Sequence, residues 1–365
     1  MEHRGSKPPP CPYEGPDFKI EITRHRPPPP FGSTYKINEY RPRLEDEELL
    51  ELPRSLHVLK YPVVETDQVD DPSKAELTMD EPIQVGSDIQ AQVIVCTVTP
   101  QCGEPYRAVA KIFDPLYRRS VDEESRLPFD ITRRADKNYA LEAAAYQIFD
   151  QAGLTGNLVP EYYGSWTFSL DNDSHARRSV RLILIEYLDG CSIADLIWGN
   201  RGPEVEPCSF PYSDAFDEAY RLEVMAQILD AQTRLMHSGV HHADLCDRNV
   251  MVVPDPRIPQ KNDRPQSATP RVVIVDFGWV DILHLKNVHD QIPSWRTELP
   301  HNPLEPNWSS WPATLSDFGK WMPAAWRGAG DPERFFLERN WLYRVFKDSE
   351  RAQLYEPLKI HGKDT

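Results

Sequence analysis

The chain has 365 residues, of which 40% are hydrophobic and 10% aromatic, enough for the core of one large two-lobed unit or of two domains. Its net charge of −16 argues against a nucleic-acid partner, because a phosphate backbone requires a basic face. No segment has the composition of a secretory signal or a membrane-spanning helix, so we expect no membrane partner. The six cysteines lack paired spacing, which predicts free thiols in an intracellular protein, cytoplasmic or nuclear.

Prolines are concentrated in the N-terminal part of the chain, with runs at residues 8–10 and 27–30. Polyproline stretches are stiff and join neither helices nor central strands. Residues 1–50 are therefore predicted to form a Pro-rich, largely extended or disordered N-terminal segment that acts as a spacer. Binding of this segment to a proline-recognising module is the alternative.

Regular structure is predicted from about residue 75 onward. Runs of β-branched and aromatic residues predict strands, and a stretch dense in Ala, Leu, Glu and Gln predicts one helix among them. The strands are residues 92–98, 107–113, 162–168 and 180–187, and the helix is residues 139–151. This order is typical of a small antiparallel sheet with one main helix. Further helices are predicted after Gly190, at residues 192–198, 214–237, 317–326 and 332–348.

Two short motifs accompany apolar strands in the second half of the chain. Asp244 and Asn249 stand just before the apolar residues 250–253. The tripeptide Asp-Phe-Gly at residues 276–278 directly follows the apolar residues 272–275. Each strand thus carries a carboxylate or an amide at one of its ends. Such groups could hold a metal-bound triphosphate, so the two motifs together predict phosphoryl transfer from a nucleotide.

Lys111 lies in an otherwise apolar predicted strand. An isolated buried ammonium group is costly, so Lys111 needs an anionic partner unless it reaches solvent at the edge of a sheet. Glu142 is the best candidate, because it lies on the predicted helix 139–151 and the three alanines after it allow that helix to approach the sheet. Glu123 and Glu124 are weaker alternatives.

The ordered set of motifs resembles the protein-kinase-like superfamily over about residues 75–350, and it looks like the divergent kinase-like proteins of filamentous fungi. The residues that carry the resemblance are Lys111, Glu142, Glu186, Leu188, Asp244, Asn249 and Asp276. The resemblance implies an α+β, two-lobed protein-kinase-like fold. A small antiparallel-sheet N-lobe with one main helix would span about residues 75–187, and a larger, mostly helical C-lobe about residues 188–350. Residues 351–365 would form a C-terminal tail.

The resemblance also implies ATP and Mg²⁺ as cofactors and gives individual residues a role. Asp244 would accept the proton of the acceptor hydroxyl, Lys111 would contact the phosphates, and Glu142 would position Lys111. Asn249 and Asp276 would bind the metal. The nucleotide contacts would be Gly86, Val93, Val109, Lys111, Glu186, Leu188 and Met251.

Several residues depart from the kinase pattern and leave the acceptor open. Ala243 replaces the Arg of His-Arg-Asp, Cys246 replaces the Lys of Ser/Thr kinases, and the loop ahead of the lysine keeps one glycine, Gly86. The adjacent His242 is predicted to be a packed or hydrogen-bonded loop residue, not a metal ligand. Our first prediction is transfer to a Ser/Thr hydroxyl of a protein. The alternatives are a small-molecule hydroxyl kinase, similar to choline or aminoglycoside kinases, and a pseudokinase acting as a nucleotide-binding interaction module.

Overall fold

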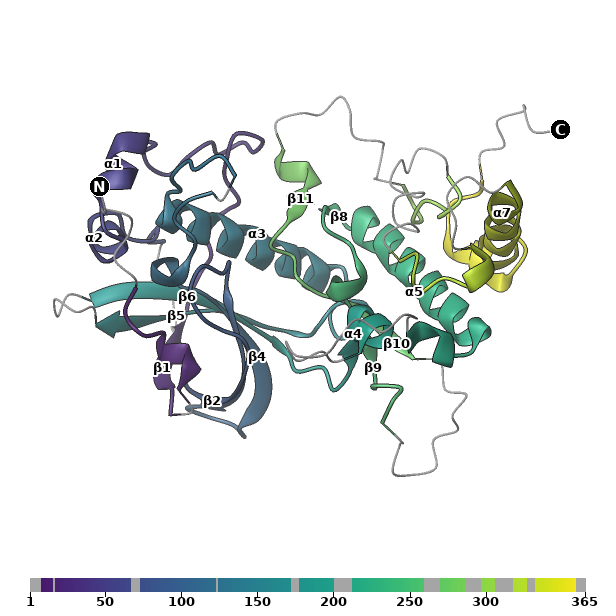
Figure 1. Ribbon diagram of the computed structural model, residues 1–365, viewed down its shortest axis with the longest axis horizontal. Helices are drawn as coiled ribbons and strands as arrows, with labels where there is room; N and C mark the ends of the chain where they lie inside the picture. Colours follow the sequence, from purple (N-terminus) through teal and green to yellow (C-terminus); the bar gives the residue numbers. More distant parts are fainter. Residues whose placement is uncertain are drawn as a thin grey trace. The chain divides into compact units, whose positions relative to one another are not determined.

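The computed structural model divides into two compact units, and each unit is made of three segments of the chain (Figure 1). The first unit comprises Met1–Gln147, Glu161–Tyr187 and Phe277–Asn287, and the second comprises Ile148–Pro160, Leu188–Asp276 and Val288–Thr365. Within these units the structure describes residues 8–15, 17–66, 73–122, 124–171, 177–199, 212–258, 270–286, 297–305, 318–326 and 332–358.

Antiparallel strands of the first unit form a closed barrel in the order β1-β2-β3-β4-β6-β5. Because strand side chains alternate between two faces, one face of each strand can fill the interior of the barrel. The first strand closes the barrel, because it pairs with β2 on one side and with β5 on the other. The strands are β1 (Lys19–Arg24), β2 (Lys74–Gln84), β3 (Gln92–Pro100), β4 (Tyr106–Phe113), β5 (Tyr162–Asp171) and β6 (Arg177–Glu186).

Apolar side chains of neighbouring strands meet in the core of this unit. Ile94 of β3, Ala110 of β4 and Leu184 of β6 are direct neighbours in register, and all three are fully buried. The N-terminal segment adds Tyr13, whose buried hydroxyl donates to Asp114 Oδ2 at 2.7 Å. The segment that was expected to be extended or disordered therefore contributes both a strand and core side chains.

Helices of the first unit lie outside the sheet. Figure 1 shows the main helix, α3, beside the strands of the barrel, with two short N-terminal helices near its first turns. Ala140, Ala143 and Ala145 of α3 are fully buried, so small side chains let this helix pack closely. The elements are α1 (Asp46–Glu51), α2 (Arg54–Lys60), α3 (Ile131–Gln151), β11 (Val280–Ile282) and the 3₁₀ helices η1 (Pro12–Glu14), η2 (Pro115–Tyr117) and η5 (Leu283–Leu285).

The second unit combines helices with a small antiparallel sheet of order β10-β9-β7. Its helix α4 begins at a capping box, in which Ser192 Oγ accepts from the Asp195 N–H at 3.0 Å and Asp195 Oδ2 accepts from the Ser192 N–H at 3.1 Å. The elements are β7 (Cys191–Ser192), α4 (Ile193–Trp198), η3 (Tyr212–Ala215), α5 (Glu218–His237), β8 (Val240–His242), η4 (Asp247–Asn249), β9 (Val250–Val253), β10 (Arg271–Ile274), η6 (Ala324–Trp326), α7 (Pro332–Phe346) and η7 (Glu350–Leu354).

The predicted two-lobed protein-kinase-like fold is wrong. A small sheet with one main helix and a larger, mostly helical C-lobe were expected, whereas the structure has a closed six-stranded antiparallel barrel and six α-helices in its described residues. The difference arises in two strands that the sequence analysis did not predict, β1 and β2 (Lys74–Gln84). The N-terminal prolines flank β1 but do not interrupt it. Because β1 supplies both pairings that close the sheet, overlooking this strand leaves an open sheet in place of a barrel.

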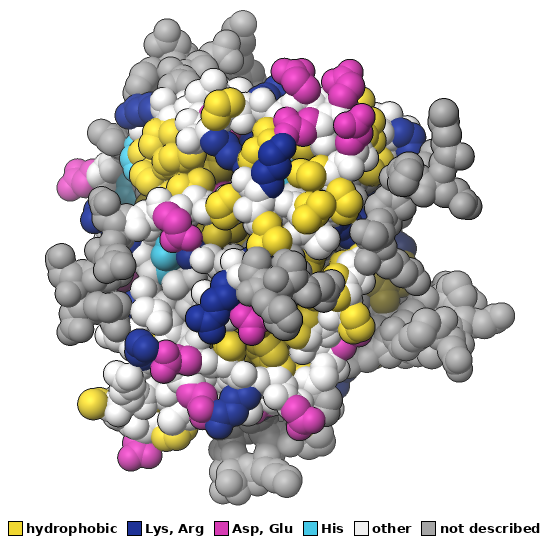
Figure 2. Space-filling model, turned by 90° about the vertical axis from the view of Figure 1, so that its left-hand side faces the viewer, with side chains coloured by type: hydrophobic (Ala, Val, Ile, Leu, Met, Phe, Trp, Pro, Cys, Tyr) yellow, Lys and Arg dark blue, Asp and Glu magenta, His cyan; other side chains and the backbone are white. Residues whose placement is uncertain are grey.

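Charged and apolar side chains are interspersed on the face seen in Figure 2, which is the left-hand side of Figure 1. Acidic side chains gather near the upper edge of this face, whereas acidic and basic groups lie beside one another lower on it. In the part of the chain that the structure describes, no helix is both long enough and apolar enough to cross a membrane.

Candidate active site

Lys111 and Glu142 form an almost buried ion pair in the first unit. Lys111 Nζ lies 2.9 Å from Glu142 Oε1 and 2.7 Å from Oε2, and the two side chains are 13% and 1% exposed. Strand β4 carries the lysine and helix α3 carries the glutamate, so the pair joins the main helix to the barrel. The structure thus brings together two residues that the sequence paired, whereas Glu124 is exposed and Glu123 lies outside the described residues.

The register of the barrel places two predicted nucleotide contacts beside Lys111. Val93 of β3 lies opposite Lys111 in the antiparallel pairing, and Val109 precedes Lys111 by two residues on the same face of β4. The other face of β4 carries Ala110 and Ile112, which belong to the barrel core. One face of the sheet therefore combines an amine with apolar side chains. The amine is suited to the phosphates of a nucleotide, and the apolar side chains are suited to its base.

The loop between β2 and β3 is held by two hydrogen bonds between Gly86 and Gln92, the first residue of β3. Gly86 N–H donates to Gln92 Oε1 at 2.8 Å, and Gln92 Nε2 donates to the Gly86 carbonyl at 2.9 Å. Gly86 has a φ of 136°, a conformation that glycine adopts far more readily than other residues. In the same loop, Asp88 pairs with Arg54 at 2.6 Å. The N–H that a phosphate would need at Gly86 is thus already bonded, through a glutamine that the sequence analysis did not single out.

Glu186, Leu188 and Met251 were predicted to contact the nucleotide. Glu186, in the first unit, donates its N–H to the Glu161 carbonyl at 2.9 Å and accepts from the Glu161 N–H at 3.0 Å through Oε2. In the second unit, the Leu188 carbonyl accepts from the Gly190 N–H at 2.9 Å, and Met251 lies half-buried in β9. The Glu186 N–H is therefore engaged within its own unit, and base recognition by these residues stays a prediction.

In the second unit, Asp244 is held by two residues of its own loop. Arg248 Nη2 donates to its two carboxylate oxygens at 2.8 and 2.7 Å, and this bond raises the pKa of Arg248. Asn249 Nδ2 donates to Asp244 Oδ2 at 3.2 Å and to the Asp244 carbonyl at 2.7 Å. The Arg248 side chain is 60% exposed and that of Asp244 37% exposed. Because exposed ion pairs contribute only about 0–1 kcal/mol, Arg248 is easily displaced from Asp244.

His242 connects this loop to the residue that precedes Asp276. Its Nδ1 accepts from the Asp244 N–H at 3.2 Å, and its Nε2 donates to the Val275 carbonyl at 3.2 Å. Both bonds together require a neutral ring with its proton on Nε2. Burial lowers the pKa of His242, although the Val275 carbonyl and the two nearby carboxylates act to raise it. The prediction of a hydrogen-bonded histidine is confirmed, but His242 is the last residue of strand β8 and does not lie in a loop.

We expect His242→Ala to lower the free energy of unfolding by about 1–3 kcal/mol, because the substitution leaves a buried N–H and a buried carbonyl without their partner. The stabilisation by the wild-type ring should be present above about pH 6.5 and be lost as the pH falls, because the unfolded histidine binds a proton before the folded one does. Urea unfolding between pH 5 and pH 8 measures both effects. A loss no larger than that of His241→Ala, which removes the neighbouring half-buried ring, would contradict this role.

Asn249 and Asp276 offer oxygen atoms of the kind that Mg²⁺ binds. The amide nitrogen of Asn249 is bonded to Asp244, which leaves Asn249 Oδ1 as the side-chain atom suited to a cation. Val275 N–H donates to the Asn249 carbonyl at 2.9 Å, and this bond ties Asn249 to the residue before Asp276. Among the described residues no group of three His, Cys, Asp or Glu could hold a metal ion. A cation here would be held by Asn249 and Asp276 together with phosphate oxygens and water.

Comparison with known proteins gives no family assignment. The sequence matches no protein-family model, and a search of curated proteins finds no match to it. The resemblance to the protein-kinase-like superfamily therefore rests on the motifs themselves, and the roles of the residues stay predictions.

Proposed function

We propose that this protein is an ATP- and Mg²⁺-dependent phosphotransferase that uses kinase-like sequence motifs, and that it transfers the γ-phosphate to a hydroxyl group, in the first place of a protein Ser or Thr. The observation that carries the proposal is the ion pair between Lys111 and Glu142, whose side chains are 13% and 1% exposed. The desolvation of a buried ion pair often offsets its attraction, so such a pair is weak evidence for stability. Its position beside Val93 and Val109 favours a role in holding phosphates.

The proposed reaction assigns one step to each group. Lys111 contacts the phosphates, and Glu142 holds Lys111 in place. As the acceptor oxygen forms its bond to the γ-phosphorus, the bond from that phosphorus to the β–γ bridging oxygen breaks and ADP leaves. The acceptor proton passes to the carboxylate of Asp244, which Arg248 must first release. When bound, Mg²⁺ would neutralise charge on the phosphates.

An intracellular location is part of the proposal. The cysteines at which the structure describes a side-chain environment are free thiols, as is typical of a reducing compartment. ATP as the donor fits the same compartment. The free thiols are Cys11, Cys96, Cys102, Cys191 and Cys246.

A second candidate function is a nucleotide-binding interaction module without phosphotransfer. The loop between β2 and β3 favours it, because the Gly86 N–H is occupied by Gln92 and because Asp88 adds a carboxylate that repels phosphate. A third candidate keeps the reaction but changes the acceptor to the hydroxyl of a small molecule. The exposed Ala243 favours this reading, because it replaces the arginine of conventional protein kinases.

The test is ADP formation from ATP by the purified protein with Mg²⁺, alone and with two panels of acceptors. We expect autophosphorylation and stimulation by peptides that contain Ser or Thr, and we expect EDTA to stop the reaction. Stimulation by small hydroxyl compounds alone would replace the protein acceptor. Nucleotide binding without any ADP formation would overturn the phosphotransferase in favour of the interaction module.

A further inference from the structure

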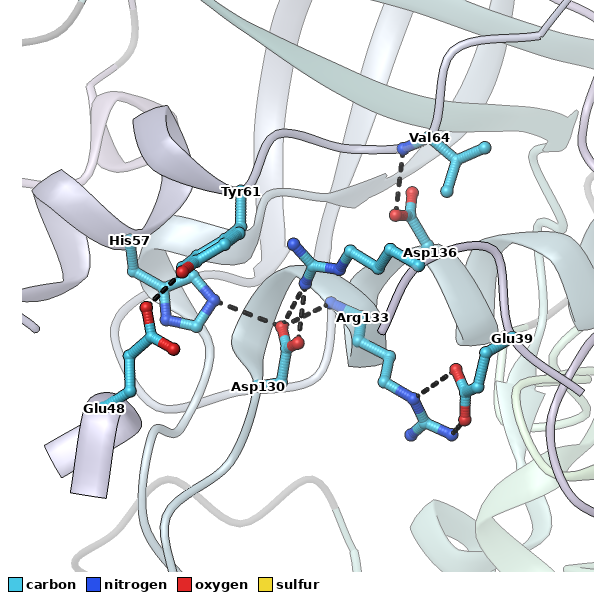
Figure 3. Close-up of polar contacts among 9 residues, drawn as sticks. Glu39, Glu48, His57, Tyr61, Val64, Asp130, Arg133 and Asp136 are labelled. Carbon is cyan, nitrogen blue, oxygen red and sulfur yellow. Dashed lines mark hydrogen bonds and ion pairs between the residues drawn. The ribbon is translucent and has the colours of Figure 1, made fainter. Parts of the chain in front are cut away.

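Residues 39–66, here named the strap, are attached to the N-terminal half of α3 (Figure 3). The strap includes α1 and α2 and belongs, like α3 up to Gln147, to the first unit. At its start, Glu39 accepts two hydrogen bonds from the guanidinium of Arg133, one of them from Nε at 2.7 Å. Near its end, the backbone of Val64 is bound to Asp136. A third acid of this attachment is Asp130, and the strap also buries the apolar side chains of Val58 and Val63.

The carboxylate of Asp130 accepts hydrogen bonds from three residues. It accepts from Arg41 Nη2 at 2.6 Å, from His57 Nε2 at 3.1 Å and from the Arg133 N–H at 2.9 Å. Burial acts to raise the pKa of Asp130, but the bonds from His57 and Arg133 and the charge of Arg41 outweigh burial and hold the pKa below its usual range. Asp130 is therefore ionised at neutral pH and binds the strap as an anion.

Asp136, which lies on α3 itself, has a different environment from Asp130, which immediately precedes the helix. Its side chain is buried, Oδ2 accepts from the Val64 N–H at 3.0 Å, and Oδ1 has no hydrogen-bond partner among the described residues. The carbonyl of the same Val64 accepts from Arg181 Nη2 of β6 at 3.0 Å. Burial raises the pKa of Asp136 to about 7, although the Val64 N–H and the charges of Arg181 and Arg41 act to lower it. This attachment is therefore tightest when Asp136 is neutral.

The charged and titratable groups that face Asp136 come from the strap, from α3 and the residue before it, and from β6. They are Tyr40 and Arg41 on the strap, Asp130 just before α3, Tyr139 on α3, and Arg181 on β6, which also pairs with Glu65 at 2.9 Å and lies near His25. Burial raises the pKa values of Tyr40 and Tyr139 and lowers that of His25 to about 3. These three side chains therefore stay neutral between about pH 6 and pH 8 and do not titrate in that range.

Helix α3 connects the strap to the ion pair of the proposed active site. Glu142 follows Asp136 by six residues on the same continuous helix, about 9 Å along the axis at a rise of about 1.5 Å per residue. A helix of this length moves as a rigid rod on the scale of one or two turns. Asp136 and Glu142 therefore lie less than two turns apart on one helix.

We propose that Asp130 and Asp136 are positioning residues, which attach the strap to α3 and thereby hold Glu142 against Lys111, and that the attachment at Asp136 loosens as the pH rises from 6 to 8. The attachment and its pH dependence stand on the contacts of the strap alone. The effect on Glu142 rests on the proposed phosphotransfer function.

The sign of the pH effect follows from proton linkage. Two states are compared: the docked state, in which the strap contacts α3, and the released state, in which it does not. The docked strap buries Asp136 and favours its protonated form, whereas the Asp136 carboxyl in the released state is ionised at any pH near neutrality. The docked strap therefore binds one proton more than the released strap, and its stability falls as the pH rises through about 7. With the docked pKa near 7, the docking equilibrium should weaken about tenfold between pH 6 and pH 8. Asp130 contributes no change in this range, because it stays ionised in both states.

The test is amide hydrogen exchange of the strap in the full-length protein at pH 6, 7 and 8, expressed as protection factors after division by the intrinsic exchange rates. We expect protection of residues 60–66 to fall about tenfold from pH 6 to pH 8 in the wild type. Asp136→Asn should abolish this dependence, because the amide oxygen still accepts from Val64 and does not titrate. The matched variant Asp130→Asn should lower protection at all three pH values and keep the pH dependence.

A wild-type strap with constant protection would overturn the proposal, as would a pH dependence that persists in Asp136→Asn, since another group would then be responsible. The second readout is single-turnover ADP formation with Mg²⁺ and ATP, which should fall relative to Asp136→Asn as the pH rises. If strap protection changes while the two proteins keep the same rate ratio, the positioning of Glu142 is overturned and phosphotransfer stands. If the wild type forms no ADP at any pH, phosphotransfer and positioning both fail, whereas the exchange data still decide the attachment.

Discussion

Lys111→Met is expected to abolish phosphotransfer and to lower the free energy of unfolding by about 3–5 kcal/mol, the cost of removing one partner of a buried ion pair. Glu142 would remain in the interior with its side chain 1% exposed and its charge without the ammonium group that lies 2.7 Å away in the wild type. The amine that should contact the phosphates would be absent as well. Urea unfolding measures the first effect, and single-turnover ADP formation measures the second.

A double variant separates the catalytic effect from the structural one. Lys111→Met combined with Glu142→Gln removes both charges, so most of the lost stability should return, because replacing a buried pair by neutral groups of similar volume is often neutral or stabilising. Phosphotransfer should stay absent, because neither group can act on the nucleotide. Return of activity together with stability would show that the pair is structural only, and that its place beside Val93 and Val109 has no catalytic meaning.

Asp276→Asn is expected to lower phosphotransfer about 100-fold or more while the protein stays folded. A metal held at this carboxylate would contribute several kcal/mol of charge stabilisation in the transition state, and each about 1.4 kcal/mol is tenfold in rate. Asp276 has a φ of 65°, in the left-handed region. Asparagine tolerates this conformation as aspartate does, so the backbone should be retained and only the charge is lost.

The matched control for Asp276→Asn is Asp247→Asn in the loop that carries Asp244. This change also removes one carboxylate from the second unit, but Asp247 has no place in the proposed site, so the rate should stay within about twofold of the wild type. Circular dichroism and urea unfolding confirm that both variants are folded. Equal rates for both variants would remove Asp276 from the metal site.

Local sequence patterns predicted several elements of the fold and the first contact of the candidate site. The predicted helix at residues 139–151 lies within α3, and that at residues 214–237 overlaps α5. Dense helix-forming residues determine such segments locally. The contact between Lys111 and Glu142 was predicted because the motifs resemble the protein-kinase-like superfamily, which implies a glutamate partner on the following helix, and because a buried ammonium group requires an anion.

The closed barrel could not be predicted in this way, because closure depends on pairing between distant strands. The alternation of Ile20 and Ile22 with charged and polar residues marks β1 in the sequence. The surrounding prolines nevertheless favoured an extended or disordered segment. Only the pairings of Thr23 with Thr167 and of Ile22 with Ala75 reveal that this strand joins both edges of the sheet.

The side-chain contacts of the loops were equally beyond local reasoning. The closure of the Gly86 loop by Gln92 and the bond from Arg248 to Asp244 depend on loop geometry that residue types alone do not specify. The attachment of the strap is a third example, because it joins Asp136 to the backbone N–H of Val64. A backbone donor leaves no trace in the amino-acid sequence, although a buried acid on a helix always requires a partner of some kind.

The central claim is that Lys111 and Asp276 act on ATP held with Mg²⁺. Its most direct test is single-turnover formation of ADP from γ-labelled ATP, with excess protein, comparing the wild type with Asp276→Asn and with the double variant of Lys111 and Glu142. The account predicts Mg²⁺-dependent ADP formation by the wild type, a loss of about 100-fold or more in Asp276→Asn and none detectable in the double variant. Equal ADP formation by the three folded proteins, or its absence from the wild type, would contradict the account.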